Sequence, residues 1–77
     1  MKSYFNNTRI AAVVTISIDS VSQESEENLA IGEPGDDAVM LPVKAVLGIH
    51  DVIVAPGKEL RVSEGTLATF IAVRSAP

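Results

Sequence analysis

The chain has 77 residues and no cysteine, so it forms one small domain without disulfides or thiolate metal sites. Its formal net charge is −4, and because general nucleic-acid binding needs basic contacts to phosphates, we expect no nucleic-acid partner. A single histidine leaves little for a structural zinc site, so we expect oligomerisation to supply the stability that so small a core lacks.

The composition predicts strands rather than helices. Valine, isoleucine and threonine make up 21 of the 77 residues, and these β-branched side chains favour a pleated sheet. Apolar residues are 47% of the chain and aromatic residues only 4%, so we expect a core of small aliphatic side chains. So much apolar content on a short chain leaves part of it at the surface, which indicates a protein partner or further copies of the chain.

Residues 1–8 are interpreted as an N-terminal arm, which Tyr4 and Phe5 anchor onto the core or onto a neighbouring subunit. The triplet Asn6-Asn7-Thr8 matches the N-glycosylation pattern, which carries little weight without a secretion signal. The apolar run 10–18 is too short to span a bilayer, and no small-x-small cleavage site follows it. We therefore expect no membrane partner and no signal peptide, and the sequence gives no localisation.

Residues 9–19 are predicted to form the first strand, because apolar side chains alternate through them. The alternating face is expected to carry Ile10, Ala12, Val14, Ile16 and Ile18. The second face begins with Ala11 and Val13 and then becomes polar. We expect a partner to cover these two residues.

The segment 19–37 holds seven of the ten acidic residues and neither lysine nor arginine, so its net charge is −7 against +3 for the rest. Ser20 to Gln23 have the spacing of a helix capping box, but Leu29 and Ile31 alternate as in a strand. We expect a solvated loop that leads into a short strand at 28–31. Pro34-Gly35 then suits a type II turn.

Three interpretations of this acidic segment remain open. Calcium binding needs six to eight oxygen ligands, but the EF-hand pattern is absent and we expect no metal and no other cofactor. A solvated loop that aids solubility is the plainest interpretation. The third is an electrostatic surface that faces a partner, in which DNA mimicry is a weak special case. The partner-facing residues would then be Glu24, Glu26, Glu27, Asp36 and Asp37.

Strands are predicted through the rest of the chain. Residues 38–47 form a long strand that Pro42 places at an edge or on a bulge, since proline cannot donate to a ladder. Residues 48–55, 59–63 and 66–74 follow with tight turns at 55–58 and 64–65, which predicts a three-stranded meander. The whole chain is expected to be an all-β antiparallel sandwich or small barrel.

The last predicted strand is apolar on both faces, with Leu67, Ile71 and Val73 against Ala68, Phe70 and Ala72. A strand buried on both faces lies in the centre of a sheet or in an interface. We therefore expect Phe70 to contribute to a contact surface.

His50 and Asp51 are the one adjacent pair that resembles catalytic chemistry. Neighbouring side chains on a strand point to opposite faces, so these two residues cannot pair with each other. We expect His50 to be half-buried and hydrogen-bonded to a neighbouring strand, and the chain not to be an enzyme. A lone histidine in an interface could also tune assembly with pH.

The sequence favours a structural or interaction subunit that homo-oligomerises and docks on a larger assembly, such as a minor or decorating component of a virus particle. Its expected contact residues are Tyr4, Phe5, Ala11, Val13 and Phe70. The alternative is a small acidic inhibitor or regulator that engages a partner protein through residues 19–37.

Overall fold

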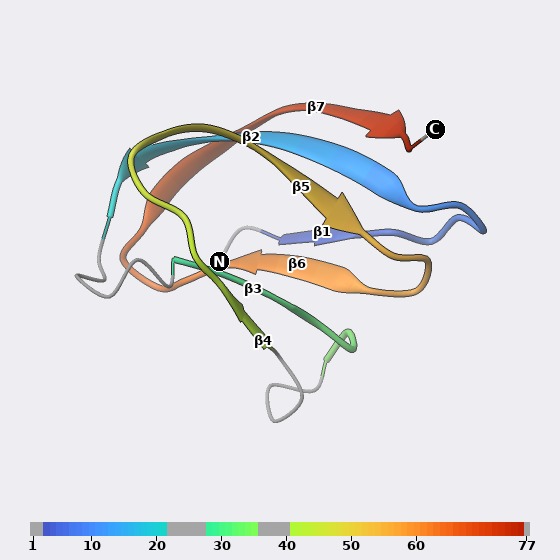
Figure 1. Ribbon diagram of the computed structural model, residues 1–77. Coiled ribbons are helices and arrows are strands. Elements are labelled where there is room, and N and C mark those ends of the chain that lie inside the picture. The colour runs from blue at the N-terminus through green and yellow to red at the C-terminus, as the bar shows by residue number, and fades with distance from the viewer. Residues whose placement is uncertain (1–2, 22–27, 36–40, 77) are drawn as a thin grey trace.

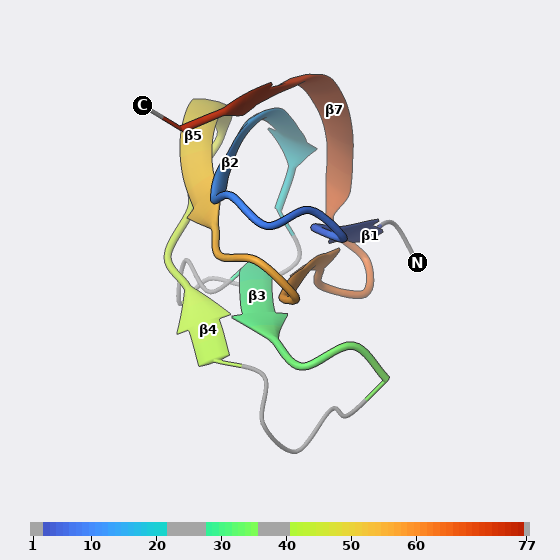
Figure 2. The same cartoon turned by 90° about the vertical axis from the view of Figure 1, so that its right-hand side faces the viewer.

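The computed structural model describes residues 3–21, 28–35 and 41–76, which form two antiparallel sheets packed face to face (Figures 1 and 2). The strands are β1 (Ser3–Phe5), β2 (Ala12–Ser20), β3 (Leu29–Gly32), β4 (Leu41–Val43), β5 (Gly48–Val54), β6 (Glu59–Val62) and β7 (Leu67–Ser75). One sheet has the order β1-β6-β3-β4 and the other β5-β2-β7. The predicted all-β sandwich is confirmed, and the two sheets do not close into a barrel.

The predicted meander is wrong, although β5, β6 and β7 do follow one another through tight turns. β5 and β7 belong to the three-stranded sheet and β6 to the four-stranded sheet, so the chain crosses between the layers at each turn. The first crossing is fastened to the end of β1. The Gly57 amide donates to the Asn6 carbonyl (2.8 Å), and the Asn6 amide donates to the Lys58 carbonyl (2.9 Å).

The core lies between the sheets and is aliphatic, as predicted. From β2, Val14 and Ile16 are fully buried and Ile18 is nearly so. Leu60 on β6 and Leu29 on β3 oppose them from the second sheet. The alternation predicted for the first strand therefore holds from Ala12 to Ile18. It fails at Ile10, which precedes β2 and is 57% exposed.

β7 is an edge strand, so of the two predicted positions the centre of a sheet is wrong, and a place in an interface stays a prediction. A β-bulge explains why the sequence looked apolar on both faces. Phe70 lies opposite Ile16 and Ala72 opposite Thr15, which leaves Ile71 without a partner on β2. The extra residue resets the alternation, so Val73 shares the core side with Phe70 instead of lying on the other face.

The strand predicted for 38–47 ends at Val43 in the structure. β4 covers Leu41–Val43 only, and residues 38–40 lie outside the described part of the chain. Pro42 lies at the edge of its sheet, as predicted. After β4, two side chains form hydrogen bonds with backbone carbonyls. Asn28 Nδ2 donates to the Ala45 carbonyl (2.8 Å), and His50 Nε2 lies 2.7 Å from the Val46 carbonyl. These bonds hold residues 44–47 as a connection that crosses to β5.

Candidate interaction surface

The side of the β5-β2-β7 sheet that faces away from β1-β6-β3-β4 is the candidate site, and we call it the outer face (Figures 1 and 2). Its side chains alternate with the buried residues of β2 and with their partners on β5 and β7. Strand register assigns to it Ile49, Asp51, Ile53, Val13, Thr15, Ser17, Thr69, Ala72 and Arg74. Because no further layer of the described chain covers this face, its chemistry is available to a partner.

Large aliphatic side chains line both edges of this sheet. On β5, Ile49 is 69% exposed and Ile53 is 65% exposed. On β7, Leu67 is 64% exposed and Ile71 is 52% exposed. Single exposed aliphatic residues are ordinary on a folded protein, whereas this small sheet exposes large aliphatic side chains along both of its edges.

A polar stripe runs between the two aliphatic edges. Thr15 Oγ1 donates to Asp51 Oδ1 (2.6 Å), and Arg74 donates to Thr15 Oγ1 (3.2 Å) and to Asp51 Oδ2 (3.3 Å). The Thr15 hydrogen bond, followed by that of Arg74, lowers the pKa of Asp51 below its ordinary value of 3.8. These hydrogen bonds link the three strands of the sheet across the outer face.

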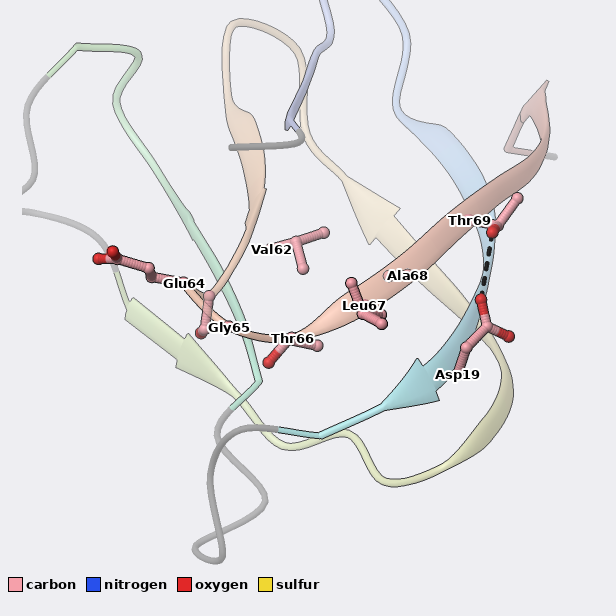
Figure 3. Close-up of a pocket in the computed structure, with 9 residues that line it drawn as sticks. Asp19, Val62, Glu64, Gly65, Thr66, Leu67, Ala68 and Thr69 are labelled. Atoms are coloured by element: carbon pink, nitrogen blue, oxygen red, sulfur yellow. Dashed lines mark hydrogen bonds between the residues drawn. The ribbon is translucent and has the colours of Figure 1, made fainter.

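A second polar group lies around Asp19, near the end of β2. Ser17 Oγ donates to Asp19 Oδ1 (3.0 Å), and Thr69 Oγ1 donates to Asp19 Oδ2 (3.2 Å, Figure 3). Both hydroxyls therefore bind the carboxylate from the outer face. The described residues offer Asp19 no ion pair with a cation.

Beside Asp19 lies a depression of about 680 Å³, next to the turn that joins β6 and β7 (Figure 3). Its lining consists of Asp19, Val62, Ser63, Glu64, Gly65, Thr66, Leu67, Ala68 and Thr69. The Thr66 hydroxyl donates to Asn28 Oδ1 (3.1 Å), which gives it a structural role. The lining contains no histidine, cysteine or lysine, and Thr69 and Asp19, which bond to each other, are both part of it.

His50 and Asp51 point to opposite sides of β5, as predicted. His50 lies opposite the core residue Ile16, whereas Asp51 lies opposite Thr15 on the outer face. His50 is half-buried and its Nε2 contacts the Val46 carbonyl. The predicted hydrogen bond to a neighbouring strand is wrong, because Val46 belongs to the connection before β5.

The aromatic residues predicted as contacts divide between core and surface. Tyr4 packs against the core from β1, and Phe70 packs against it from β7. Phe5 lies on the opposite side of β1 from Tyr4 and is 45% exposed. Tyr4 thus anchors the arm onto the core, the first of the two alternatives.

The two small residues predicted as contacts lie near the start of β2. Ala11 precedes the strand and is half-buried. Val13 belongs to the outer face but is only 8% exposed, between Ile53 and Arg74. The five predicted contact residues therefore do not gather into one patch, and their role in an interface stays a prediction.

The acidic residues predicted to face a partner, Glu24, Glu26, Glu27, Asp36 and Asp37, lie outside the described residues. Within the described part of the acidic segment, Glu33 forms an ion pair with Lys58. Asp19 is held by the two hydroxyls above. In the described ranges, no group of three or more histidine, cysteine or acidic residues is placed to hold a metal ion.

The side chain of Asn6, the acceptor of the glycosylation pattern, is fully buried. Its amide nitrogen donates to the carbonyls of Ile10 and Val54, both at 2.9 Å. The folded chain therefore does not present this nitrogen for modification. Among residues 3–21, 28–35 and 41–76, no helix has the length and apolar character needed to cross a membrane.

Comparison with protein families, with characterised proteins and with solved structures finds no significant match to this chain.

Proposed function

We propose that the chain is a non-enzymatic structural subunit that associates with copies of itself and docks on a larger protein assembly. The outer face of the β5-β2-β7 sheet carries this proposal. It combines exposed aliphatic edges, represented by Ile53 and Ile71, with a polar stripe whose members bind one another. Because the members of the stripe pair with one another, a partner can cover them without leaving a charge unpaired, and the exposed aliphatic side chains add apolar area to the contact.

The small size of the chain supports the same proposal. A domain of 77 residues buries a limited core, and association adds the burial that one copy lacks. A minor or decorating component of a virus particle is the type of subunit with these features.

The second candidate function is a small acidic inhibitor or regulator of another protein. The observation in its favour is the separation of charge, with −7 on residues 19–37 and +3 on the remainder. In that function the acids provide recognition and the outer face does not.

Light scattering and native mass spectrometry over a range of concentrations test the proposal. The wild-type chain is expected to self-associate, and the double variant Ile53→Lys/Ile71→Lys is expected to stay monomeric with an unchanged circular dichroism spectrum. Both isoleucines are exposed, so lysine at these positions spares the core.

The matched control neutralises the acidic segment with Glu24→Gln, Glu26→Gln and Glu27→Gln. A structural subunit should associate normally with these changes. A wild-type chain that stays monomeric at the highest concentrations used for NMR would overturn the proposal in favour of the second candidate.

A further inference from the structure

We infer that two copies of the chain pair antiparallel through the edge of β7 that faces away from β2, so that their sheets join in the order β5-β2-β7-β7-β2-β5. This inference rests on the proposed function and names the surface that brings copies together. The contact is backbone pairing between two edge strands, a mode in which main-chain groups supply affinity and the flanking side chains set the register.

β7 is the edge best suited to pairing among the four described. β1 and β4 have three residues each, and Pro42 in β4 lacks the N–H that a ladder needs. β5 has seven residues and β7 has nine. Within β7, Arg74 is the only charged residue and there is no proline. Charges and prolines are the residues that usually keep a long edge strand from pairing with another chain, so β7 has little to prevent such pairing.

The faces of β7 select one register for such a pair. Opposed residues in an antiparallel pair lie on the same face of the sheet. With a two-fold axis between Ile71 and Ala72, the core-side residue Phe70 of one copy meets the core-side residue Val73 of the other. Thr69 and Arg74, which both belong to the outer face, also meet. A shift by one residue would oppose outer-face to core-side residues along the strand.

The bulge lies at the centre of this arrangement. Ile71 has no partner on β2 and is 52% exposed, and the axis places it beside Ala72 of the second copy. Bulges often protect an edge by twisting it away or by presenting a charge. Here the bulged residue presents a large aliphatic side chain, which two copies bury together.

Charge complementarity follows from the same register. Arg74 of each copy meets Thr69 of the other, and the Thr69 hydroxyl donates to Asp19 (3.2 Å). Each Arg74, which pairs with Asp51 of its own copy, is thereby also brought towards Asp19 on β2 of the other copy, and this happens twice in one dimer. Full overlap of two β5 edges would instead centre on Asp51 and oppose like charges, which disfavours that edge.

Single-cysteine variants test the register directly, because the chain has no cysteine of its own. The axis places the two copies of residue 72 about 6 Å apart, within reach of a disulfide. The two copies of residue 69 lie about 17 Å apart, since the offset is five residues (74 − 69 = 5). Ala72→Cys should therefore form a covalent dimer on oxidation, and Thr69→Cys and the remote Ile53→Cys should not.

Lysine variants measure the energetics. Ile71→Lys should raise the dimer dissociation constant at least about tenfold in sedimentation experiments, whereas Ile53→Lys on the far edge should leave it unchanged. An oligomer that Ile53→Lys dissolves and Ile71→Lys spares, without cross-linking of Ala72→Cys, overturns β7 pairing and leaves the proposed function standing. A wild-type chain that never associates overturns both.

Discussion

Asn6 and Asn28 occupy matching places at opposite ends of β6, and both side chains are fully buried. Asn6 follows β1 and its backbone amide donates to the Lys58 carbonyl (2.9 Å), just before β6. Asn28 precedes β3 and its carbonyl accepts from the Ser63 amide (2.9 Å), just after β6. Since β1 and β3 flank β6, the two asparagines fix the strand from both sides and from both ends.

Replacing either buried amide by a carboxyl group should destabilise the fold strongly. Asn28 Nδ2 donates to the Ala45 carbonyl (2.8 Å), so Asn28→Asp turns a donor into an oxygen that faces another oxygen. We expect each of Asn6→Asp and Asn28→Asp to lower the free energy of unfolding by about 3 kcal/mol, measured by urea denaturation. The exposed control Asn7→Asp should stay within about 0.5 kcal/mol of wild type, and equal midpoints for all three would contradict this role.

Strand faces and turns could be predicted from the sequence because both depend on neighbouring residues. Alternation placed Val14, Ile16 and Ile18 on one face of the first strand, and the structure buries all three in the core. The turn glycines Gly57 and Gly65 have positive φ values of 77° and 85°, as tight turns of this kind require.

The assignment of strands to sheets could not be predicted, because it depends on contacts distant in sequence. The turn at 55–58 looks like a hairpin, yet bonds between Gly57, Lys58 and Asn6 carry it across to the other layer. The periodicity of apolar residues also does not reveal the bulge at Ile71. Because of this bulge, the sequence of an edge strand resembles that of a strand buried on both faces.

The candidate site was missed for a related reason. The sequence predicts Tyr4 and Phe70 as contact residues, although both pack against the core. The signal for the outer face was present in β5, where alternation sets Ile49 and Ile53 opposite the buried Val52 and Val54. Which face of β5 is buried depends on where the β1-β6-β3-β4 sheet packs. That sheet covers the side of Val52 and Val54 and leaves the two isoleucines exposed.

The two faces of the three-stranded sheet should differ sharply in their sensitivity to truncation. Ile16 is fully buried on the central strand, so Ile16→Ala should cost about 2–5 kcal/mol through lost burial and the cavity left behind. Ile53 is 65% exposed on the opposite face, and Ile53→Ala should cost less than about 1 kcal/mol. Thermal and urea unfolding of the two variants under monomeric conditions measures both losses. Similar decreases in the free energy of unfolding would mean that Ile53 is covered rather than exposed.

The Thr15 hydroxyl should control the acidity of Asp51. Its hydrogen bond is the largest single cause of the lowered pKa of Asp51, ahead of the hydrogen bond from Arg74, so Thr15→Val should raise that pKa. An NMR titration of the Asp51 carboxyl carbon measures the shift. Thr69→Val, which alters the other hydroxyl group of the outer face, is the matched control and should leave the titration of Asp51 unchanged.

The same lowered pKa of Asp51 sets the sign of the pH dependence. The carboxylate is favoured in the folded chain, so its contribution to stability is fully present above the ordinary pKa of 3.8. That contribution is lost as pH falls through the lower pKa of the folded state. Asp51→Asn should remove this component from unfolding curves recorded at acidic pH, and an unchanged acid limb would contradict the network.

Gly57 should tolerate asparagine better than alanine. Its φ of 77° lies in the left-handed region, whereas a Cβ at this position would meet no atom within 4 Å, so the cost is conformational rather than steric. Gly57→Ala should lower the free energy of unfolding by about 1 kcal/mol, and Gly57→Asn by less, because asparagine adopts this conformation more readily. Equal losses in urea denaturation would indicate that the turn changes conformation instead.

Phe70 and Ile71 are neighbours on β7 with opposite roles, and aspartate substitutions should separate stability from assembly. Phe70 packs against the core, so Phe70→Asp places a charge at its margin and should cost about 3 kcal/mol in urea unfolding of the monomer. Ile71 is 52% exposed, so Ile71→Asp should cost less than about 1 kcal/mol. In light scattering, Ile71→Asp should nevertheless weaken self-association, whereas any loss of assembly in Phe70→Asp accompanies partial unfolding. A folded Phe70→Asp variant with wild-type stability would place this ring outside the core and restore it as a contact residue.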